Sequence, residues 1–266
     1  MRVRLPHLLL NIKQTNEMSV SKHYTIKPTD NYCSPRDSRT VYFKSASSYS
    51  FTFMLDDSCL YYLGDPKYDL DLNKLAGISR NLSLSQCGTR VGWNCGGKTM
   101  DELRADPWFQ LRAYVEENNR RVPTSNTSLD KIGSVRPKVY YDVHVIFRPM
   151  NQSEIDKYKL LSARDGKSSP TGSDKSIYDS GYNYVSEIKI SISDKKDEFG
   201  NLLNPNYAEM TSTVGSIGKY IKGTTRAVMP IKKPSSLGYY HYYPYFGGDY
   251  PLGCPHEMDI HIIHQY

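Results

Sequence analysis

The sequence predicts a mainly β protein, an antiparallel β-sandwich with added helices and a helical N-terminal arm. Several segments alternate β-branched or aromatic residues with polar ones, which is the pattern of half-buried strands. Few helical segments lie between them, so a parallel sheet with helical crossovers is not expected. With 266 residues, of which 38% are hydrophobic and 23% charged, the chain is long enough to bury a full core.

The N-terminal segment predicts a helical arm that contacts another subunit. Between residues 2 and 18, four apolar side chains would share one helix face: Leu5, Leu8, Leu9 and Ile12. An apolar stripe at a chain end has little of its own chain to pack against, so a neighbouring copy is its expected partner. We therefore expect an arm at residues 1–20 and a sandwich core at 21–266, with inserted helices and a tyrosine-rich C-terminal segment.

Strands are expected along most of the remaining chain. They are TVYFKSASSYSFTFML as two runs, KVYYDVHVIF, YVSEIKISIS, TTRAVMPI and MDIHIIH. The clearest helix is expected between Thr99 and Arg121, broken near Pro107, because proline cannot continue a helix. A second short helix is expected to begin at Ser153.

The stretch GWNCGGKT matches the letters G-x-x-x-x-G-K-T of a phosphate-binding loop, with Gly92, Gly97, Lys98 and Thr99 at the defining positions. In such a loop the lysine contacts phosphate and the threonine binds the metal ion. The segment before it is not a buried apolar strand, and a proline follows within about two helical turns. We therefore expect a glycine-rich turn that caps the next helix, with passive phosphate or nucleotide binding as the open alternative.

The C-terminal stretch CPHEMDIHIIH contains five side chains of metal-binding type: Cys254, His256, Glu257, His261 and His264. On a helix, Glu257, His261 and His264 would share a face. The isoleucines favour a strand, however, and a strand sends His261 and His264 to opposite faces. No metal site and no cofactor are therefore predicted.

Charge, cysteines and hydropathy narrow the function classes. The net charge of +6 is mild, and lysines and arginines are interspersed with acids, so no specific nucleic-acid partner is predicted. Five cysteines form no C-x-x-C pair, which favours reduced thiols. No apolar run approaches the roughly 18 residues of a membrane span, so no membrane partner is expected, and the chain is expected to be intracellular.

Tyrosine is the most unusual feature of the composition, with 23 tyrosines against 7 phenylalanines. Six lie in LGYYHYYPYFGGDYP: Tyr239, Tyr240, Tyr242, Tyr243, Tyr245 and Tyr250. Glycine and proline make a regular element unlikely in this stretch, so the rings are expected to pack against other subunits and against the core. In strong alkali, 14 arginines would face 28 carboxylates and 23 phenolates, a net charge of −37. These phenols are therefore predicted to release an assembly as the pH rises.

The order of segments resembles the polyhedrins of insect cypoviruses. The resemblance is spread over residues 90–222 and is carried by VGWNCGGKTMDELRADPWFQLRAYVEE, RPKVYYDVHVIFRP, YVSEIKISISDKKDEFG and LLNPNYAEMTSTVGSIGKY. It implies a non-enzymatic viral matrix protein that packs as trimers in crystals around virus particles and dissolves in alkali. Some members of that family hold nucleotides in the lattice.

The expected function is therefore self-assembly into occlusion bodies, or polyhedra, in the cytoplasm of an infected host cell. The expected partners are other copies of the chain and virus particles. Two alternatives stay open at this point. One is a P-loop nucleotide-binding protein or NTPase, and the other is a secreted β-rich binding or toxin-like protein.

Overall fold

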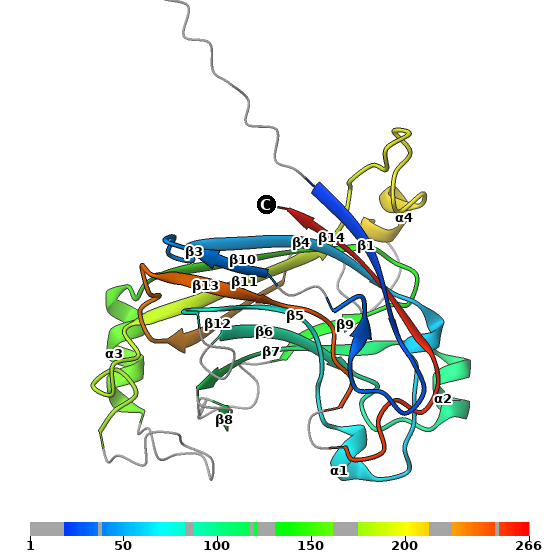
Figure 1. The fold of residues 1–266 in the computed structure, drawn as a ribbon, viewed down its shortest axis with the longest axis horizontal. Helices are drawn as coiled ribbons and strands as arrows, with labels where there is room; N and C mark the ends of the chain where they lie inside the picture. Colours follow the sequence, from blue (N-terminus) through cyan, green and yellow to red (C-terminus); the bar gives the residue numbers. More distant parts are fainter. Residues whose placement is uncertain are drawn as a thin grey trace, which may run out of the picture.

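The computed structural model describes residues 19–36, 39–82, 88–117, 120–121, 131–161, 175–212, 225–247 and 250–265. Within these residues the chain forms two seven-stranded sheets, and each pair of neighbouring strands is antiparallel. Figure 1 shows the two sheets stacked one above the other. The predicted antiparallel β-sandwich is confirmed.

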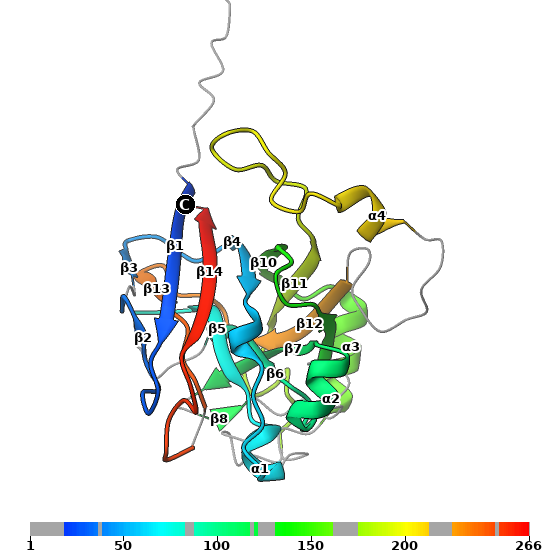
Figure 2. The same ribbon diagram turned by 90° about the vertical axis from the view of Figure 1, so that its right-hand side faces the viewer.

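Sheet A has the strand order β12-β11-β10-β4-β14-β1-β2, and its strands β4, β10 and β11 lie above β5, β6 and β7 of the other sheet in Figure 1. Its strands are β1 (Ser19–Ile26), β2 (Cys33–Ser34), β4 (Ser48–Leu55), β10 (Tyr141–Pro149), β11 (Tyr184–Ile192), β12 (Thr225–Ile231) and β14 (Met258–Gln265). Strands β1 and β14 come from opposite ends of the chain and lie side by side in both Figure 1 and Figure 2.

Sheet B has the order β3-β13-β5-β6-β7-β8, with β9 also paired to β7. Its strands are β3 (Arg39–Tyr42), β5 (Asn73–Ser79), β6 (Gly88–Asn94), β7 (Phe109–Glu117), β8 (Arg120–Arg121), β9 (Lys131–Val135) and β13 (Gly238–Tyr242). The central strand β6 is buried along its whole length. Two glycines, Gly88 and Gly92, interrupt the alternating pattern by which strands are recognised, so the sequence did not predict β6.

The helices are short and lie around the sandwich. They are η1 (Asp57–Cys59), α1 (Pro66–Asp69), α2 (Met100–Ala105), α3 (Gln152–Leu160) and α4 (Tyr207–Thr211). Helix α3 begins at Gln152, one residue before the predicted start at Ser153, because Asn151 and Glu154 form a capping box at its first turn. None of the described helices is long and apolar enough to cross a membrane.

The predicted helix between Thr99 and Arg121 is correct only for its first part. Helix α2 ends at Ala105, and the residues after Pro107 form β7 in the middle of sheet B. In β7, apolar residues alternate with polar ones, and Phe109 and Leu111 point into the core. Period-two alternation and pairing with β6 outweigh the helix propensity of the segment.

The predicted helical arm has no support in the structure. The residues of its apolar stripe, Leu5, Leu8, Leu9 and Ile12, lie outside the described residues. At the end of the predicted arm, Ser19 and Val20 belong to strand β1 and pair with Gln265 and His264 of β14. Strand β1 thus includes the last two residues of the predicted arm.

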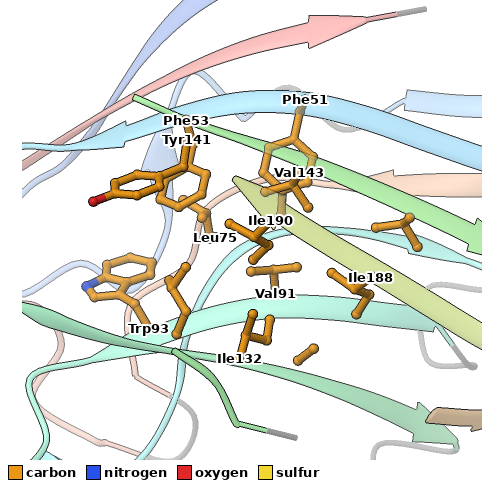
Figure 3. Packing of buried hydrophobic residues seen from close by; sticks show 14 of the residues in the cluster. Phe51, Phe53, Leu75, Val91, Trp93, Ile132, Tyr141, Val143, Ile188 and Ile190 are labelled. Atoms are coloured by element: carbon orange, nitrogen blue, oxygen red, sulfur yellow. The ribbon is translucent and has the colours of Figure 1, made fainter. Parts of the chain in front are cut away.

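The core lies between the two sheets and is one continuous cluster of buried side chains. Figure 3 shows Phe51, Phe53 and Tyr141 from sheet A facing Trp93 and Val91 from sheet B. Sheets packed face to face bury their inward side chains in this way and leave two outer faces. Those outer faces carry most of the polar groups considered below.

Candidate functional sites

The GWNCGGKT segment is a turn between β6 and α2. Gly92 is part of β6, whereas Gly96 and Gly97 adopt positive φ angles of 66° and 69° in the turn. A Cβ atom on Gly96 would lie 2.6 Å from the Trp108 ring, so only glycine fits there. The glycines therefore have structural reasons that do not involve phosphate.

Lys98 and Thr99 are both bonded to Glu102 in the first turn of α2. The Thr99 N–H donates to Glu102 Oε2 at 2.9 Å, and the Glu102 N–H donates back to Thr99 Oγ1. Lys98 Nζ lies 3.0 Å from Glu102 Oε1. These bonds, led by the Thr99 N–H, lower the pKa of Glu102 to about 2. The predicted helix-capping role is confirmed, and the six-residue α2 is much shorter than the helix of a phosphate-binding loop.

The candidate metal ligands near the C-terminus are dispersed by β14. As predicted for a strand, His261 and His264 lie on opposite faces of sheet A, and each ring contacts two hydroxyl groups. Cys254 instead donates from Sγ to the carbonyl oxygen of His256 at 2.8 Å. Among the described residues, no group of three or more His, Cys, Asp or Glu side chains could hold a metal ion.

His264 is buried between the sheets, where two phenols hold its ring. Tyr24 Oη lies 2.9 Å from Nε2, and Tyr49 Oη lies 2.8 Å from Nδ1. Burial, with a smaller contribution from the charge of Lys22, lowers the pKa of His264 to about 4. At neutral pH this imidazole is therefore uncharged, and it can donate one hydrogen bond and accept one.

His261 forms a second cluster on the outer face of sheet A. Its Nε2 lies 2.6 Å from Ser21 Oγ and its Nδ1 lies 2.8 Å from Tyr140 Oη, while its ring stacks on His23 at 4.0 Å between centroids. Burial, followed by the charge of His23, lowers the pKa of His261 to about 4. Sequence analysis did not find this cluster because its members come from three distant strands or strand ends.

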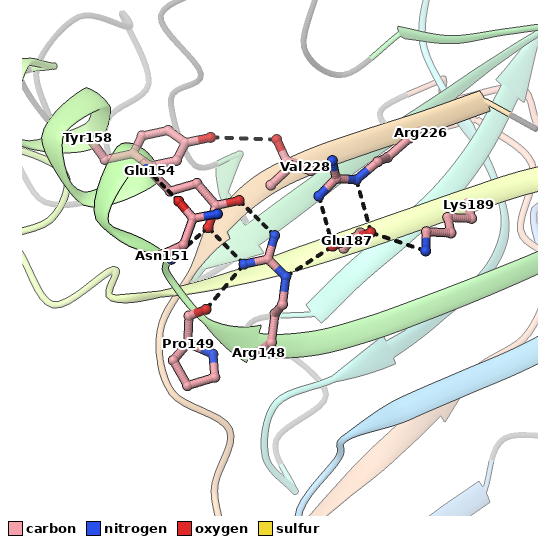
Figure 4. A network of polar contacts seen from close by, with 9 residues as sticks. All are labelled: Arg148, Pro149, Asn151, Glu154, Tyr158, Glu187, Lys189, Arg226 and Val228. Atoms are coloured by element: carbon pink, nitrogen blue, oxygen red, sulfur yellow. Dashed lines mark hydrogen bonds and ion pairs between the residues drawn. The ribbon is translucent and has the colours of Figure 1, made fainter.

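A charged network lies farther along the same face (Figure 4). Glu187 of β11 is only 7% exposed and accepts hydrogen bonds from Arg148 of β10 and Arg226 of β12. Arg148 also holds Glu154 of α3 through two bonds of 2.7 Å. The guanidinium of Arg226, and then that of Arg148, lower the pKa of Glu187 to about 2. This network joins three strands to α3, so its evident role is structural.

The tyrosine-rich segment is more regular than predicted. Residues 238–242 form β13, which pairs with β3 and β5, so the expectation of no regular element was wrong. Tyr239 is buried between the sheets, where it packs edge-on against His241. The glycine and proline content had predicted an irregular segment, but pairing with β3 and β5 holds these residues in a strand.

The other tyrosines of the segment are partly exposed and pack against rings of their own chain. Tyr240 packs on Tyr242, Tyr245 on Tyr32 and Tyr250 on Tyr68, with ring centroids 5.0–5.4 Å apart. Tyr243 is also partly buried, and burial, followed by the proximity of Tyr240, raises the pKa of Tyr243. The predicted packing on the core is thus present, and packing on other subunits stays a prediction.

Large apolar side chains are exposed at several separate places. Phe43 after β3 is 89% exposed, Leu160 at the end of α3 is 85% exposed, and Phe199 between β11 and α4 is 81% exposed. Leu237, the first residue of the tyrosine-rich stretch, and Leu252, the residue just after it, are exposed as well. In Figure 1, α3 and the segment leading to α4 lie at opposite ends of the molecule. The exposed apolar groups therefore do not form one patch.

Comparisons with known proteins give no family for this chain. No protein family and no curated protein matches the sequence. Among solved structures, that of the alginate lyase Aly36B aligns with 92% of this chain and 80% of its own, at 10% sequence identity and a TM-score of 0.42. A likeness this distant supports no conclusion about function.

Proposed function

We propose that this protein is a structural subunit that assembles with copies of itself into intracellular crystals. In this proposal the crystals are occlusion bodies in the cytoplasm of an infected cell, where they embed and protect virus particles. The subunits pack as trimers and act without catalysis or a required cofactor, as the resemblance to the polyhedrins implies. Alkaline pH dissolves the crystals.

The exposed apolar side chains are the observation that carries this proposal. A protein with one partner needs one contact surface, whereas a three-dimensional lattice needs several surfaces that point in different directions. Phe43, Leu160 and Phe199 provide apolar groups at three separate places on the sandwich. Each would be covered when copies pack on all sides.

The surface tyrosines support the alkaline release. Partly exposed phenols can donate hydrogen bonds to a neighbouring copy, and burial in that contact would disfavour their ionised form. Tyr243 already has a raised pKa within a single chain. Additional burial between copies would raise it further and would tie the stability of the assembly to the neutral phenol.

Electron microscopy of cells that express the full chain tests the proposal. We expect crystals inside the cells, and their absence would contradict it. In a triple variant with Phe43, Leu160 and Phe199 each replaced by serine, we expect folded protein and no crystals. A matched control replaces the exposed neighbours Lys44, Lys159 and Glu198 by serine and should still crystallise. Crystals from the apolar variant would show that these residues are not the contacts.

A further inference from the structure

Arg112 of β7 is a partly buried cation with no partner. In the part of the chain that the structure describes, its side chain makes no hydrogen bond and no ion pair, and its Nε is buried. Arg148 and Arg226, on the outer face of sheet A, are both paired with carboxylates. A buried donor without an acceptor costs free energy, so a missing acceptor is the natural explanation.

The strand pattern places Arg112 on the outer face of sheet B. Phe109, Leu111 and Ala113 of β7 point into the core, so Arg112 points away from it. In the register of the sheet Arg112 lies opposite Gly92 of β6, which has no side chain to cover it. A Cβ atom on Gly92 would lie 2.5 Å from the Asn73 carbonyl oxygen, so the position beside Arg112 is restricted to glycine.

The surroundings of Arg112 are basic and aromatic. The outward positions of β5, β6 and the first part of β7 carry three cations: Lys74, Gly77, Ser79, Gly88, Arg90, Gly92, Asn94, Gln110, Arg112 and Tyr114. A carboxylate residue, Glu116, comes next on β7, where it lies opposite Gly88 at the far end of β6. Gln110 and Tyr114 lie two residues before and after Arg112 on the same strand face. An anion at Arg112 would therefore meet a positive potential and polar side chains.

Arg90 extends this surface toward the tyrosine-rich segment. It lies opposite Gly77 on one side and Tyr114 on the other, and Gly77 lies opposite Tyr242. Across the bare glycine, the guanidinium carbon of Arg90 lies 3.5 Å from the centre of the Tyr242 ring. Such stacking holds a guanidinium in a fixed orientation. Arg90 and Arg112 are diagonal neighbours on adjacent strands, and residue positions related in this way are usually about 7–8 Å apart.

We propose that the outer face of sheet B binds an oxyanion, a carboxylate or phosphate group of a ligand, with Arg112 as its main contact. The planar fork of a guanidinium matches the two oxygens of either group. Arg90 adds positive charge on the neighbouring strand, and Gln110 provides an amide on the same face of β7. This site does not depend on the proposed assembly, and it lies apart from Lys98 and Thr99.

Calorimetric titration of the purified protein tests this site, with inorganic phosphate and malonate as the two probes and chloride as the reference at equal ionic strength. We expect binding of at least one probe beyond chloride, and the tighter probe identifies the group. Arg112→Gln should weaken binding by about 10-fold or more, the usual effect of losing a charge-assisted hydrogen-bond pair. Arg112→Lys keeps the charge but loses the planar fork, so its affinity for the probe should lie between those of the wild-type protein and Arg112→Gln.

Arg104→Gln is the matched control, because it removes the same charge from an exposed residue of α2 that is paired with Asp101. It should bind the probe as the wild-type protein does. The NMR signal of the Arg112 Nε–H is measured on the wild-type protein, so it does not depend on whether a variant folds. Its chemical shift should change when the probe is added but not when chloride is added. Equal binding by Arg112→Gln and wild type, no binding beyond chloride, or an unmoved Nε–H signal would each overturn the proposal.

Discussion

At the residue scale, the buried polar side chains of this sandwich have their partners on distant strands. Glu187, His261 and His264 each contact residues more than 35 positions away in the sequence. Composition and local pattern cannot reveal such partners, because they are set by strand register. The sequence identified His261 and His264 as candidate ligands, and the structure gives them hydroxyl partners instead.

Replacing Glu187 by glutamine should destabilise the fold by about 2 kcal/mol, because Arg148 and Arg226 would lose a buried counter-charge. The pKa of Glu187 is lowered to about 2, so its stabilising effect is full above the ordinary glutamate pKa of about 4.3. That effect is lost as the pH falls toward 2. Urea unfolding of the wild-type protein and the variant at pH 7 measures the stability difference, and the same experiment at pH 3 measures its loss in acid. Asp101→Asn, which breaks an exposed pair, is the control and should cost less than about 0.5 kcal/mol.

The two buried histidines should make the fold sensitive to mild acid. Their pKa values are lowered to about 4, whereas an unfolded histidine has a pKa of about 6.5. Stability from a lowered pKa is full above the unfolded value, and it declines as the pH falls from about 6.5 to 4. In His264→Gln, which keeps an amide but cannot titrate, the urea midpoint should change less over this range than in wild type. The exposed His144→Gln should follow the wild-type curve, and parallel curves for all three proteins would contradict the prediction.

At the element scale, the capping box of α2 explains the residues that resemble a phosphate-binding loop. Thr99→Ala should destabilise the protein by about 1 kcal/mol, since the Thr99 hydroxyl accepts the Glu102 N–H. Lys98→Ala removes an exposed ion pair and should change stability by less than about 0.5 kcal/mol. Thermal unfolding compares the two variants. Steady ATP or GTP turnover that disappears in Lys98→Ala would instead support the NTPase alternative.

The N-terminal arm gives a second prediction at this scale. Deletion of residues 1–18 should leave the sandwich folded, because β1 begins at Ser19 and its pairing with β14 is retained. The truncated protein should not crystallise in cells, since Leu5, Leu8, Leu9 and Ile12 are the predicted contacts with a neighbouring copy. Circular dichroism checks the fold and electron microscopy checks for crystals. Crystals formed by the truncated chain would show that the arm is not needed.

The sequence predicted strands well where apolar and polar residues alternate without glycine. Strands β4, β10, β11 and β14 follow that pattern and were all predicted. Strand β6 was missed because Gly88 and Gly92 interrupt the pattern, and β7 was taken for a helix. Both are defined by pairing with each other in the middle of sheet B, and pairing is a non-local property. The Arg112 site lies between these two strands, so the sequence could not have indicated it.

At the scale of the whole molecule, the tyrosines lie in two different environments, the interior of the fold and its surface. Burial raises the pKa of Tyr61 well above its ordinary value, raises that of Tyr158 to about 12, and also raises that of Tyr140. These phenols stabilise the fold of one chain. The partly exposed tyrosines between residues 240 and 250 lie where another copy could cover them. Alkali therefore acts on the fold and on the proposed contacts through separate groups.

This separation gives the last prediction, on the release of the assembly. A phenol in a dry contact between copies has a raised pKa, so its contribution is full below the free value of about 10 and is lost as the pH rises through the raised value. Replacing Tyr240, Tyr242, Tyr243, Tyr245 and Tyr250 by phenylalanine keeps the rings but removes the acids. Turbidity of purified crystals between pH 7 and 12 should then show dissolution at a higher pH than in wild type.

Tyr158→Phe is the control, because it changes a buried phenol of α3 that bonds within one chain, and it should leave the dissolution midpoint unchanged. An unchanged midpoint in the five-residue variant would assign alkaline release to lysine neutralisation or to other tyrosines.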